Sequence, residues 1–275
     1  MVAGAPPPFV VDGVALSSIH EINSLPDSEK EAIYRELIPT ELLERFHIDP
    51  RTLTDRHGNR LVSFKATPGT GSVEVEVLPE PGTVDPLLYL HLADTPNNQL
   101  EVLLFIVNDP TSPRFDVDRD WRGERTKFGT LSRNIPAEIA AMEAGLAPGQ
   151  VRRGLRLTKK LIPLFERFVW RLGHDIFFAE PLAYHNAILL ERYGFNYLRG
   201  RRKMEWIHAE FAPGRLLYRR LDGSTPFRRR GMERTVRGRS WAIHDGILGE
   251  PYTGVQMYKR VGRHAGVCTF PDAAW

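Results

Sequence analysis

The segment that decides the fold is RRGLRLTKKLIPLFERFVWRLGHDIFFAEPLAYHNAILLERYGF, residues 152–195. Its first part predicts a long helix, because apolar residues recur at spacings of three, four and seven. Gly173 would end this helix, and the apolar run 175–179 predicts a short buried strand. The helical stripe consists of Val151, Leu155, Ile162, Phe165, Val169 and Leu172.

A second helix is predicted after this strand. Pro181 suits the first turn of a helix, where its missing N–H costs nothing. The inner face of the helix would consist of Ala183, Ala187, Leu190 and Tyr193. The chain then turns at Gly194-Phe195, so the whole segment is a helix–strand–helix unit.

Upstream of this unit the hydrophobic period changes to two, which predicts strands at 61–64, 72–77, 87–92 and 100–107. Residues 96–98, Pro-Asn-Asn, favour a hairpin turn between the last two strands. Antiparallel strands followed by a helix–strand–helix unit predict an α+β fold with a mixed, mainly antiparallel sheet flanked by helices.

The remaining segments are predicted from shorter patterns. Helices are expected at 27–38, 40–46 and 136–145, and residues 1–24 are expected to be a flexible lead-in. Further strands are expected at 204–211, 240–244 and 255–258. The chain would thus comprise an N-terminal helical extension (1–59), a core (60–211) with an insertion at about 124–149, and a basic C-terminal extension (212–275).

The composition is that of an ordinary globular protein, with 42% hydrophobic and 26% charged residues in 275. The single cysteine, Cys268, excludes an internal disulfide and a multi-cysteine metal site. We expect no secretory signal and no membrane span, because no apolar run approaches ~20 residues. These features predict a cytoplasmic protein.

The charge is distributed unevenly along the chain, although the net charge is only +3. Residues 150–275 carry 24 basic against 11 acidic side chains, and residues 1–149 carry 13 against 23. This segregation favours either a polyanionic partner for the second half or attraction between the two halves.

The helix–strand–helix unit and its closing Gly-Phe resemble the GCN5-related N-acetyltransferase (GNAT) family over roughly residues 60–207. The family holds the coenzyme A pyrophosphate on a basic, glycine-containing turn at a helix N-terminus. The matching residues here are Arg152, Arg153, Gly154 and Arg156. A second register of the same turn is Arg122-Gly123, at the end of residues 115–123, which resemble the family's strand ending in Val-Asp-Pro-x-Tyr-Arg-Gly and are therefore expected to be a strand.

The resemblance implies acyl transfer from acetyl-CoA, or a longer acyl-CoA, to a small-molecule or protein amine. Asn186, in a segment of the type Asn-x-x-Ala…Gly-Phe, would contact the pantetheine arm. The family's acid is often a tyrosine five residues before the Phe, a position that Leu190 holds here. Tyr193 and Tyr184 are the nearby candidates for the acid, and Glu101 and Asp109 are candidates for the base.

Two other functions compete with acyl transfer. His208-x-Glu210 on a predicted strand, together with His244, matches the two-histidine-one-carboxylate pattern of non-haem iron sites. Nine histidines make a chance match frequent, so we expect no resident metal and keep this site as an alternative. Basic runs at 199–203 and 228–239, with Trp206, Phe227 and Trp241, would suit nucleic-acid phosphates and bases. Nucleic acid is a partner that the sequence allows without favouring it.

Overall fold

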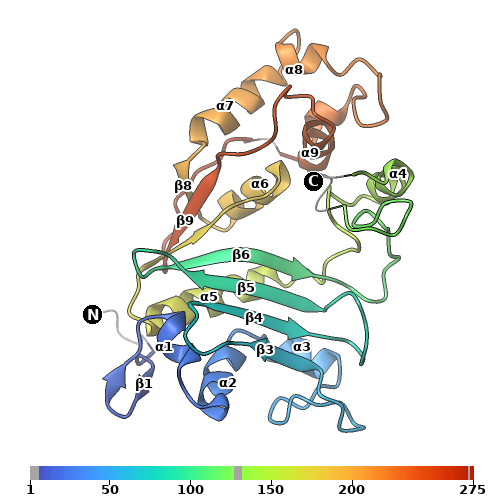
Figure 1. Cartoon of the computed structure of the whole chain (residues 1–275). Helices are drawn as coiled ribbons and strands as arrows, with labels where there is room; N and C mark the ends of the chain where they lie inside the picture. Colours follow the sequence, from blue (N-terminus) through green and yellow to red (C-terminus); the bar gives the residue numbers. More distant parts are fainter. Residues whose placement is uncertain (1–5, 127–131, 272) are drawn as a thin grey trace. The chain divides into compact units, whose positions relative to one another are not determined.

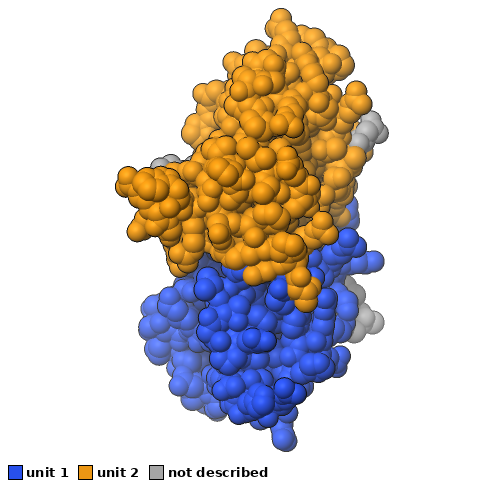
Figure 2. Space-filling view, turned by 90° about the vertical axis from the view of Figure 1, so that its right-hand side faces the viewer, with its two compact units in different colours: residues 1–110, 154–179, 258–264 blue, residues 111–153, 180–257, 265–275 orange. Residues whose placement is uncertain are grey.

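The structure is a computed structural model that describes residues 6–126, 132–271 and 273–275. It contains two compact units, which Figure 2 colours separately. Unit 1 consists of residues 1–110, 154–179 and 258–264, and unit 2 of residues 111–153, 180–257 and 265–275. Both units are discontinuous in sequence, and the expected boundaries at 59/60 and 211/212 each fall inside one unit.

The four predicted upstream strands are confirmed, and they form an antiparallel run in unit 1. A fifth strand, β7, pairs with β6 in parallel. The strands of this run are β3 (Val62–Lys65), β4 (Ser72–Val77), β5 (Leu88–Asp94), β6 (Leu100–Val107) and β7 (Ile176–Ala179).

Two more strands, β8 (Asn196–Arg199) and β9 (Gln256–Arg260), complete a seven-stranded sheet in the order β3-β4-β5-β6-β7-β9-β8. The sheet is mixed and mostly antiparallel, with helices beside it (Figure 1). The predicted α+β class is therefore confirmed. None of the helices within the described ranges is long and apolar enough to cross a bilayer.

The sheet of unit 1 has two chemically different faces. Val73, Val75 and Val77 of β4 are fully buried, whereas the alternate residues Glu74 and Glu76 remain partly exposed. This follows from the two-residue period of a strand. We call the face that carries the valines the core face and the other the open face.

Helices cover the core face of unit 1. Aromatic rings join them to the sheet, because Tyr34 stacks on Phe64 of β3 at 6.4 Å and on Phe168 at 6.3 Å. The helices are α1 (Ile19–Asn23), α2 (Asp27–Arg35), α3 (Thr40–Arg45) and α5 (Thr158–Arg171).

The expectation of a flexible lead-in over residues 1–24 is wrong for its described part. Residues 10–15 form a small hairpin of β1 (Val10–Val11) and β2 (Val14–Ala15), and Phe9, Ile19 and Ile22 are buried. Asp94 of β5 accepts hydrogen bonds from the N–H groups of Ile19 and His20, both at 2.8 Å. A partner so distant in sequence left no local signal for this packing.

Helix α5 begins later than the apolar stripe predicts, at Thr158 instead of Val151. Arg156 adopts a left-handed backbone conformation with φ of 59°, which no residue inside an α-helix takes. The segment before Thr158 is therefore a loop. Gly173, with φ of 80°, ends the helix as expected.

Unit 2 is mainly helical, and three of the strands predicted in it are wrong. Residues 204–210 lie in helix α7, with Phe211 at its C-cap, residues 240–244 lie in α9, and the segment 115–123 is a loop. The helices of unit 2 are α4 (Ile135–Glu143), α6 (Tyr184–Arg192), α7 (Arg201–Glu210), α8 (Leu216–Arg219), a 3-10 turn (Met232–Arg234) and α9 (Val236–His244).

The period of burial explains the error at residues 204–211. Met204, Ile207 and Phe211 are buried, at spacings of three and four, while Trp206 is 41% exposed. A strand would have buried Met204 and Trp206 together. A helix forms here because its period places Met204, Ile207 and Phe211 on the buried side and leaves the charged residues between them in solvent.

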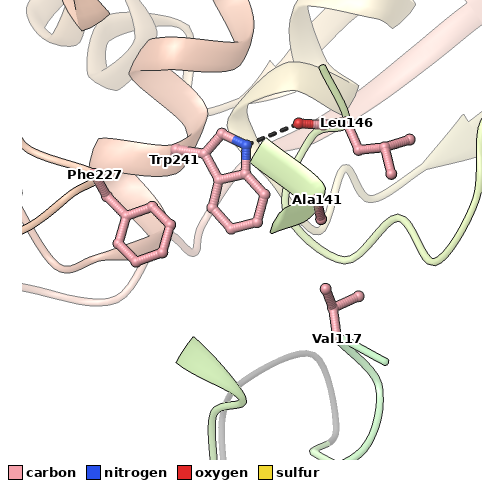
Figure 3. Packing of buried hydrophobic residues seen from close by; sticks show 5 residues of the cluster. All are labelled: Val117, Ala141, Leu146, Phe227 and Trp241. Atoms are coloured by element: carbon pink, nitrogen blue, oxygen red, sulfur yellow. Dashed lines mark hydrogen bonds between the residues drawn. The ribbon is translucent and has the colours of Figure 1, made fainter. Parts of the chain in front are cut away.

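The core of unit 2 forms around Trp241, which is 1% exposed (Figure 3). Its ring stacks on Phe227 at 5.2 Å, and its Nε1–H donates to the Leu146 carbonyl at 2.8 Å. Val117 and Ala141 complete the cluster. The insertion between β6 and α5 thus belongs to the core of this unit.

A buried charge network lies next to that core. Glu138 of α4 pairs with Arg133 and, at 3.3 Å, with His244. Asp245 pairs with Arg133 at 2.9 Å and with Arg228 at 2.8 Å. Both carboxylates are almost fully buried, so these pairs fix α4 against the end of α9.

The first stability prediction concerns Tyr34, whose hydroxyl donates to Asn23 Oδ1 at 2.6 Å in the buried core of unit 1. Tyr34→Phe leaves that oxygen without its donor, so we expect the free energy of unfolding to fall by about 1–3 kcal/mol. Urea denaturation measures it. Tyr89→Phe, on the open face, serves as the control and should change it by less than about 0.5 kcal/mol. Equal effects of both variants would contradict this account.

The second stability prediction concerns Glu138. Burial alone would raise the pKa of Glu138, but hydrogen bonds from His244 and Arg133 outweigh it and hold the pKa below its usual range. The ionised carboxylate therefore stabilises the fold above the unfolded-state pKa of about 4.3, and this stabilisation is lost as the pH falls through the lower folded-state pKa.

Glu138→Gln should accordingly destabilise the protein by about 3 kcal/mol near neutral pH, because it leaves Arg133 and His244 without their carboxylate. The difference from the wild type should shrink as the pH falls below about 4. Denaturation at a series of pH values tests this, with the exposed Glu143→Gln on the same helix as the control. A difference that does not depend on pH would refute it.

Candidate functional site

The edge of β6 that faces β7 is only partly paired. The two strands pair over three residues, with Leu100 opposite Phe177, Glu101 opposite Phe178 and Val102 opposite Ala179. Beyond this, β6 continues to Val107. Among the described residues, no backbone hydrogen bond reaches residues 103–107 from that side. Their unpaired N–H and C=O groups can therefore bind an extended chain.

A β-bulge lies at the point where the two strands part. His91 pairs with Leu104 and Leu92 with Val102, so Leu103 has no opposite residue on β5. Leu103 is 41% exposed. A bulge bends its strand and locally increases the twist. Both effects turn the second half of β6 away from β7.

The apolar residues of β6 are also less covered than those of its neighbours. Residues 101–107 are all partly or fully exposed, whereas Leu88, Leu90 and Leu92 of β5 are buried. A central strand is normally the most buried part of a sheet. The edge of β6 therefore combines apolar surface with free backbone groups.

The loop before α5 lies over the far end of this edge. A Cβ atom at Gly154 would be 3.2 Å from the Val107 carbonyl oxygen, so a larger residue would have to displace the loop. The N-terminus of α5 follows within four residues. No side chain caps it and its first turn has no acidic residue, so its N–H groups and dipole favour an anion.

Three basic side chains accompany this N-terminus. Arg156 and Lys159 are exposed, and no ion pair joins either of them to the rest of the described chain. Lys160 pairs with Glu41 at 2.6 Å. Arg156 and Lys159 are therefore the cations available to a phosphate at this helix end.

Arg152 and Arg153 make contacts within unit 2 instead. The Arg152 guanidinium donates to the Ser112 carbonyl, and that of Arg153 donates to the Ala144 carbonyl at 3.2 Å. Both side chains thus help to hold the loop. The four candidate residues of this turn therefore divide into two loop-holding arginines, a close-packed glycine and the exposed Arg156.

The alternative register at Arg122-Gly123 lies in a tight turn. Asp120 accepts hydrogen bonds from the N–H groups of Arg122 and Glu124, and Gly123 has φ of 81°. No helix begins directly after this turn; the described chain continues as a loop to Thr126. Arg122 stacks on the exposed Trp121 at 4.5 Å.

The candidate acids belong to α6 and its end. Tyr193 is partly exposed at the C-terminal end of α6, and Asn186 is partly exposed in its first turn. Tyr184 is 1% exposed, and burial raises its pKa to about 12. Its hydroxyl has no hydrogen-bond partner among the described residues; Arg239 is close enough to act electrostatically, but no hydrogen bond of acceptable geometry joins them. A group so enclosed is poorly placed to meet a substrate.

The candidate bases lie on or just after β6. Glu101 lies opposite Ala93 and is partly exposed on the open face, two residues before the bulge. Asp109 is 3.9 Å from Arg45 and thus belongs to a weak ion pair. Of the two, Glu101 is the nearer to the bulge.

The sequence analysis missed a polar pair on the open face. His91 Nε2 and Ser72 Oγ are 2.8 Å apart, on the adjacent strands β5 and β4. The only sequence signal was the polar residue at an alternate position of an otherwise apolar strand. The contact depends on the strand register, which a single sequence does not give.

The three residues of the alternative metal site, His208, Glu210 and His244, each contact a different side chain. His208 and Glu210 lie on helix α7, where a spacing of two residues puts them on different sides. His208 bonds to Arg239 at 3.1 Å, Glu210 pairs with Arg215 at 3.0 Å, and His244 pairs with Glu138. No group of three potential metal ligands occurs in the part of the chain that the structure describes.

Of the three aromatic residues that were expected to stack on nucleic-acid bases, two are buried. Phe227 and Trp241 are each 1% exposed and cannot stack on bases, while Trp206 is 41% exposed. Among the arginines, Arg228 pairs with Asp245, and Arg239 is buried beneath Phe270. What remains is a basic surface with one exposed indole.

Comparisons with protein-family models, with curated protein sequences and with solved structures found no match. The interpretation of the site therefore depends on its own geometry.

The buried phenol of Tyr184 leads to a prediction. Because its hydroxyl makes no hydrogen bond, Tyr184→Phe should leave the free energy of unfolding unchanged or raise it by up to about 1 kcal/mol. Tyr197→Phe is the matched control, since the Tyr197 hydroxyl donates to the buried Glu191 and its loss should cost about 1–3 kcal/mol. Thermal and urea denaturation measure both. A large loss of stability in Tyr184→Phe would reveal a partner that this geometry lacks.

Proposed function

We propose that this protein is an acyl-CoA-dependent N-acyltransferase that acts on a small-molecule or protein amine. The observation that carries the proposal is the unpaired edge of β6 from Leu103 to Val107, which ends beside the uncapped N-terminus of α5. Both features belong to unit 1. They offer complementary partners to the two chemically different parts of coenzyme A.

The pantetheine arm is an extended chain with two amide groups. Such a chain can lie along an unpaired strand edge and exchange hydrogen bonds with it, as an added strand does. The partly exposed apolar side chains of β6 would cover its methylene groups. The bulge at Leu103 would lie near the thioester end.

The pyrophosphate would lie at the N-terminus of α5. Free N–H groups and the positive end of the helix dipole face it, and Gly154 lets the loop pass close to the end of β6. Arg156 and Lys159 would add charge-assisted hydrogen bonds. This arrangement favours the turn at Gly154 over the turn at Arg122-Gly123, which precedes no helix directly.

The reaction itself needs a base for the acceptor ammonium and a proton for the leaving thiolate. Glu101 of unit 1 remains a candidate for the base, whereas Asn186 and Tyr193, expected from the resemblance to contact the pantetheine arm and to act as the acid, belong to unit 2. With Leu190 at the family's tyrosine position, water can serve as the acid. A resident metal has no part in this mechanism.

Arg156→Ala tests the proposal, because this exposed side chain can be removed without disturbing the fold. We expect the affinity for acetyl-CoA to fall roughly tenfold, as for the loss of one charge-assisted hydrogen bond. Isothermal titration and the ligand-induced rise in Tm measure it. A long-chain acyl-CoA in the same titrations would define the preferred acyl length.

Arg122→Ala is the matched control, since it removes an exposed arginine from the other register. It should bind acetyl-CoA like the wild type. If Arg122→Ala loses the affinity and Arg156→Ala keeps it, the pyrophosphate lies at the other turn. A wild-type protein that binds neither thioester would end the proposal.

A further inference from the structure

The open face of unit 1 carries a group of polar side chains at the level of the bulge. Directly paired residues of neighbouring strands lie on the same face, so Glu74 and His91 share it, as do His91 and Leu104. Leu104 is the residue next to the bulge. His91 is therefore one strand away from the place where β6 and β7 part.

The His91 side chain is held in a defined orientation. Its Nε2 atom lies 2.8 Å from Ser72 Oγ. If Nε2–H donates to the serine oxygen, Nδ1 keeps its lone pair and can accept a proton. The Glu74 carboxylate stands directly opposite on β4, where it would stabilise the imidazolium that results.

We propose that His91 is the general base of the acyl transfer and that its acceptor is a cationic alkylamine approaching over the open face. This inference rests on the proposed function. Ser72 is a positioning residue, because it acts on the substrate only through the His91 ring.

The proton movements balance without a further reagent. His91 Nδ1 takes one proton from the acceptor ammonium, and the neutral amine nitrogen forms a bond to the thioester carbon. The carbon–sulfur bond then breaks, and a second proton of the former ammonium leaves with sulfur as the free thiol. The products are an amide, coenzyme A and an imidazolium that releases its proton to water.

The charges around His91 determine the acceptor class. The Glu74 carboxylate accepts hydrogen bonds from Lys65 at 2.7 Å and from the Tyr89 hydroxyl at 2.9 Å. The hydrogen bond from Lys65, and after it the one from Tyr89, hold the pKa of Glu74 below its usual range although partial burial raises it.

Two further carboxylates share this face, Glu76 on β4 and Glu101 on β6. Neither makes an ion pair with any described residue, in contrast to Glu74. The titratable groups facing His91 are thus three carboxylates, one lysine and one phenol. Because the carboxylates outnumber the lysine, this environment favours an acceptor whose amine is a positively charged ammonium group.

His91→Ala tests the inference in the full-length protein. Acetyl-CoA with butylamine or spermidine is the assay, and release of the free thiol is the readout. We expect kcat/KM to fall on the order of 10²-fold, and the ascending limb of its pH profile to disappear, because that limb reports the base of the free enzyme. The Kd for acetyl-CoA should stay within about twofold, since His91 lies away from the phosphate site.

Ser72→Ala should lower kcat/KM about tenfold, whereas Ser72→Thr, which keeps the hydroxyl and suits a strand, should restore it. His57→Gln, at an exposed loop position of the same unit, is the control and should match the wild type. Equal losses in Ser72→Ala and Ser72→Thr would show that Ser72 only packs.

The outcomes separate this inference from the proposed function. If the wild type does not bind acetyl-CoA, both fail. If it binds acetyl-CoA but acylates neither amine, or if His91→Ala transfers at the wild-type rate, the inference about His91 is wrong while coenzyme binding stands.

Discussion

The site depends on one constraint, the length of the parallel ladder between β6 and β7. Strand β7 has four residues and is followed by Glu180-Pro181, and a proline cannot donate to a ladder. Pairing therefore stops at Val102, although β6 extends to Val107. A longer β7 would satisfy the edge of β6 and leave nothing for a ligand. The bulge at Leu103 and the close approach of Gly154 to Val107 then shape the two ends of the same edge.

The excess of basic residues in the second half of the chain is explained in part by contacts inside the protein and need not indicate a polyanionic partner. Two arginines of the second half are used inside unit 2: Arg228 pairs with the buried carboxylate of Asp245, and Arg239 lies under Phe270. Breaking such a buried pair would leave an uncompensated charge in the interior, so these arginines are committed to their partners. A basic balance therefore did not by itself specify a polyanionic partner. Near the N-terminus of α5, the exposed cations without an ion pair to any described residue are Arg156 and Lys159.

The sequence predicted the elements whose signal is periodic and local. The four strands of the antiparallel run, β7, α6 and the end of α5 at Gly173 follow from hydrophobic spacing and from glycine or proline at the boundaries. The sequence did not predict segments whose conformation depends on residues far away in the chain. Asp94 orders the N-terminal segment, and residues 204–211 were predicted as a strand because the sequence did not show that Met204, Ile207 and Phe211 are the buried ones. The same limit hid the Ser72–His91 contact, because a one-residue change of register would put the two side chains on opposite faces.

In the acyl transfer that we propose, Leu190 stands where the resemblance leads one to expect a tyrosine acid. Without a positioned acid, the thiolate takes its proton from the acceptor nitrogen or from water, and the chain's own contribution moves to the acceptor side. A base on β5 meets that need better than one on β6, because Glu101 precedes the bulge while His91 is paired with Leu104 directly beyond it. The imidazole also has what a lone carboxylate lacks: a serine that fixes its orientation and an opposite carboxylate that offsets its charge once protonated. In the proposed reaction the edge of β6 would bind the acyl donor, and the open face of the same sheet would activate the acceptor.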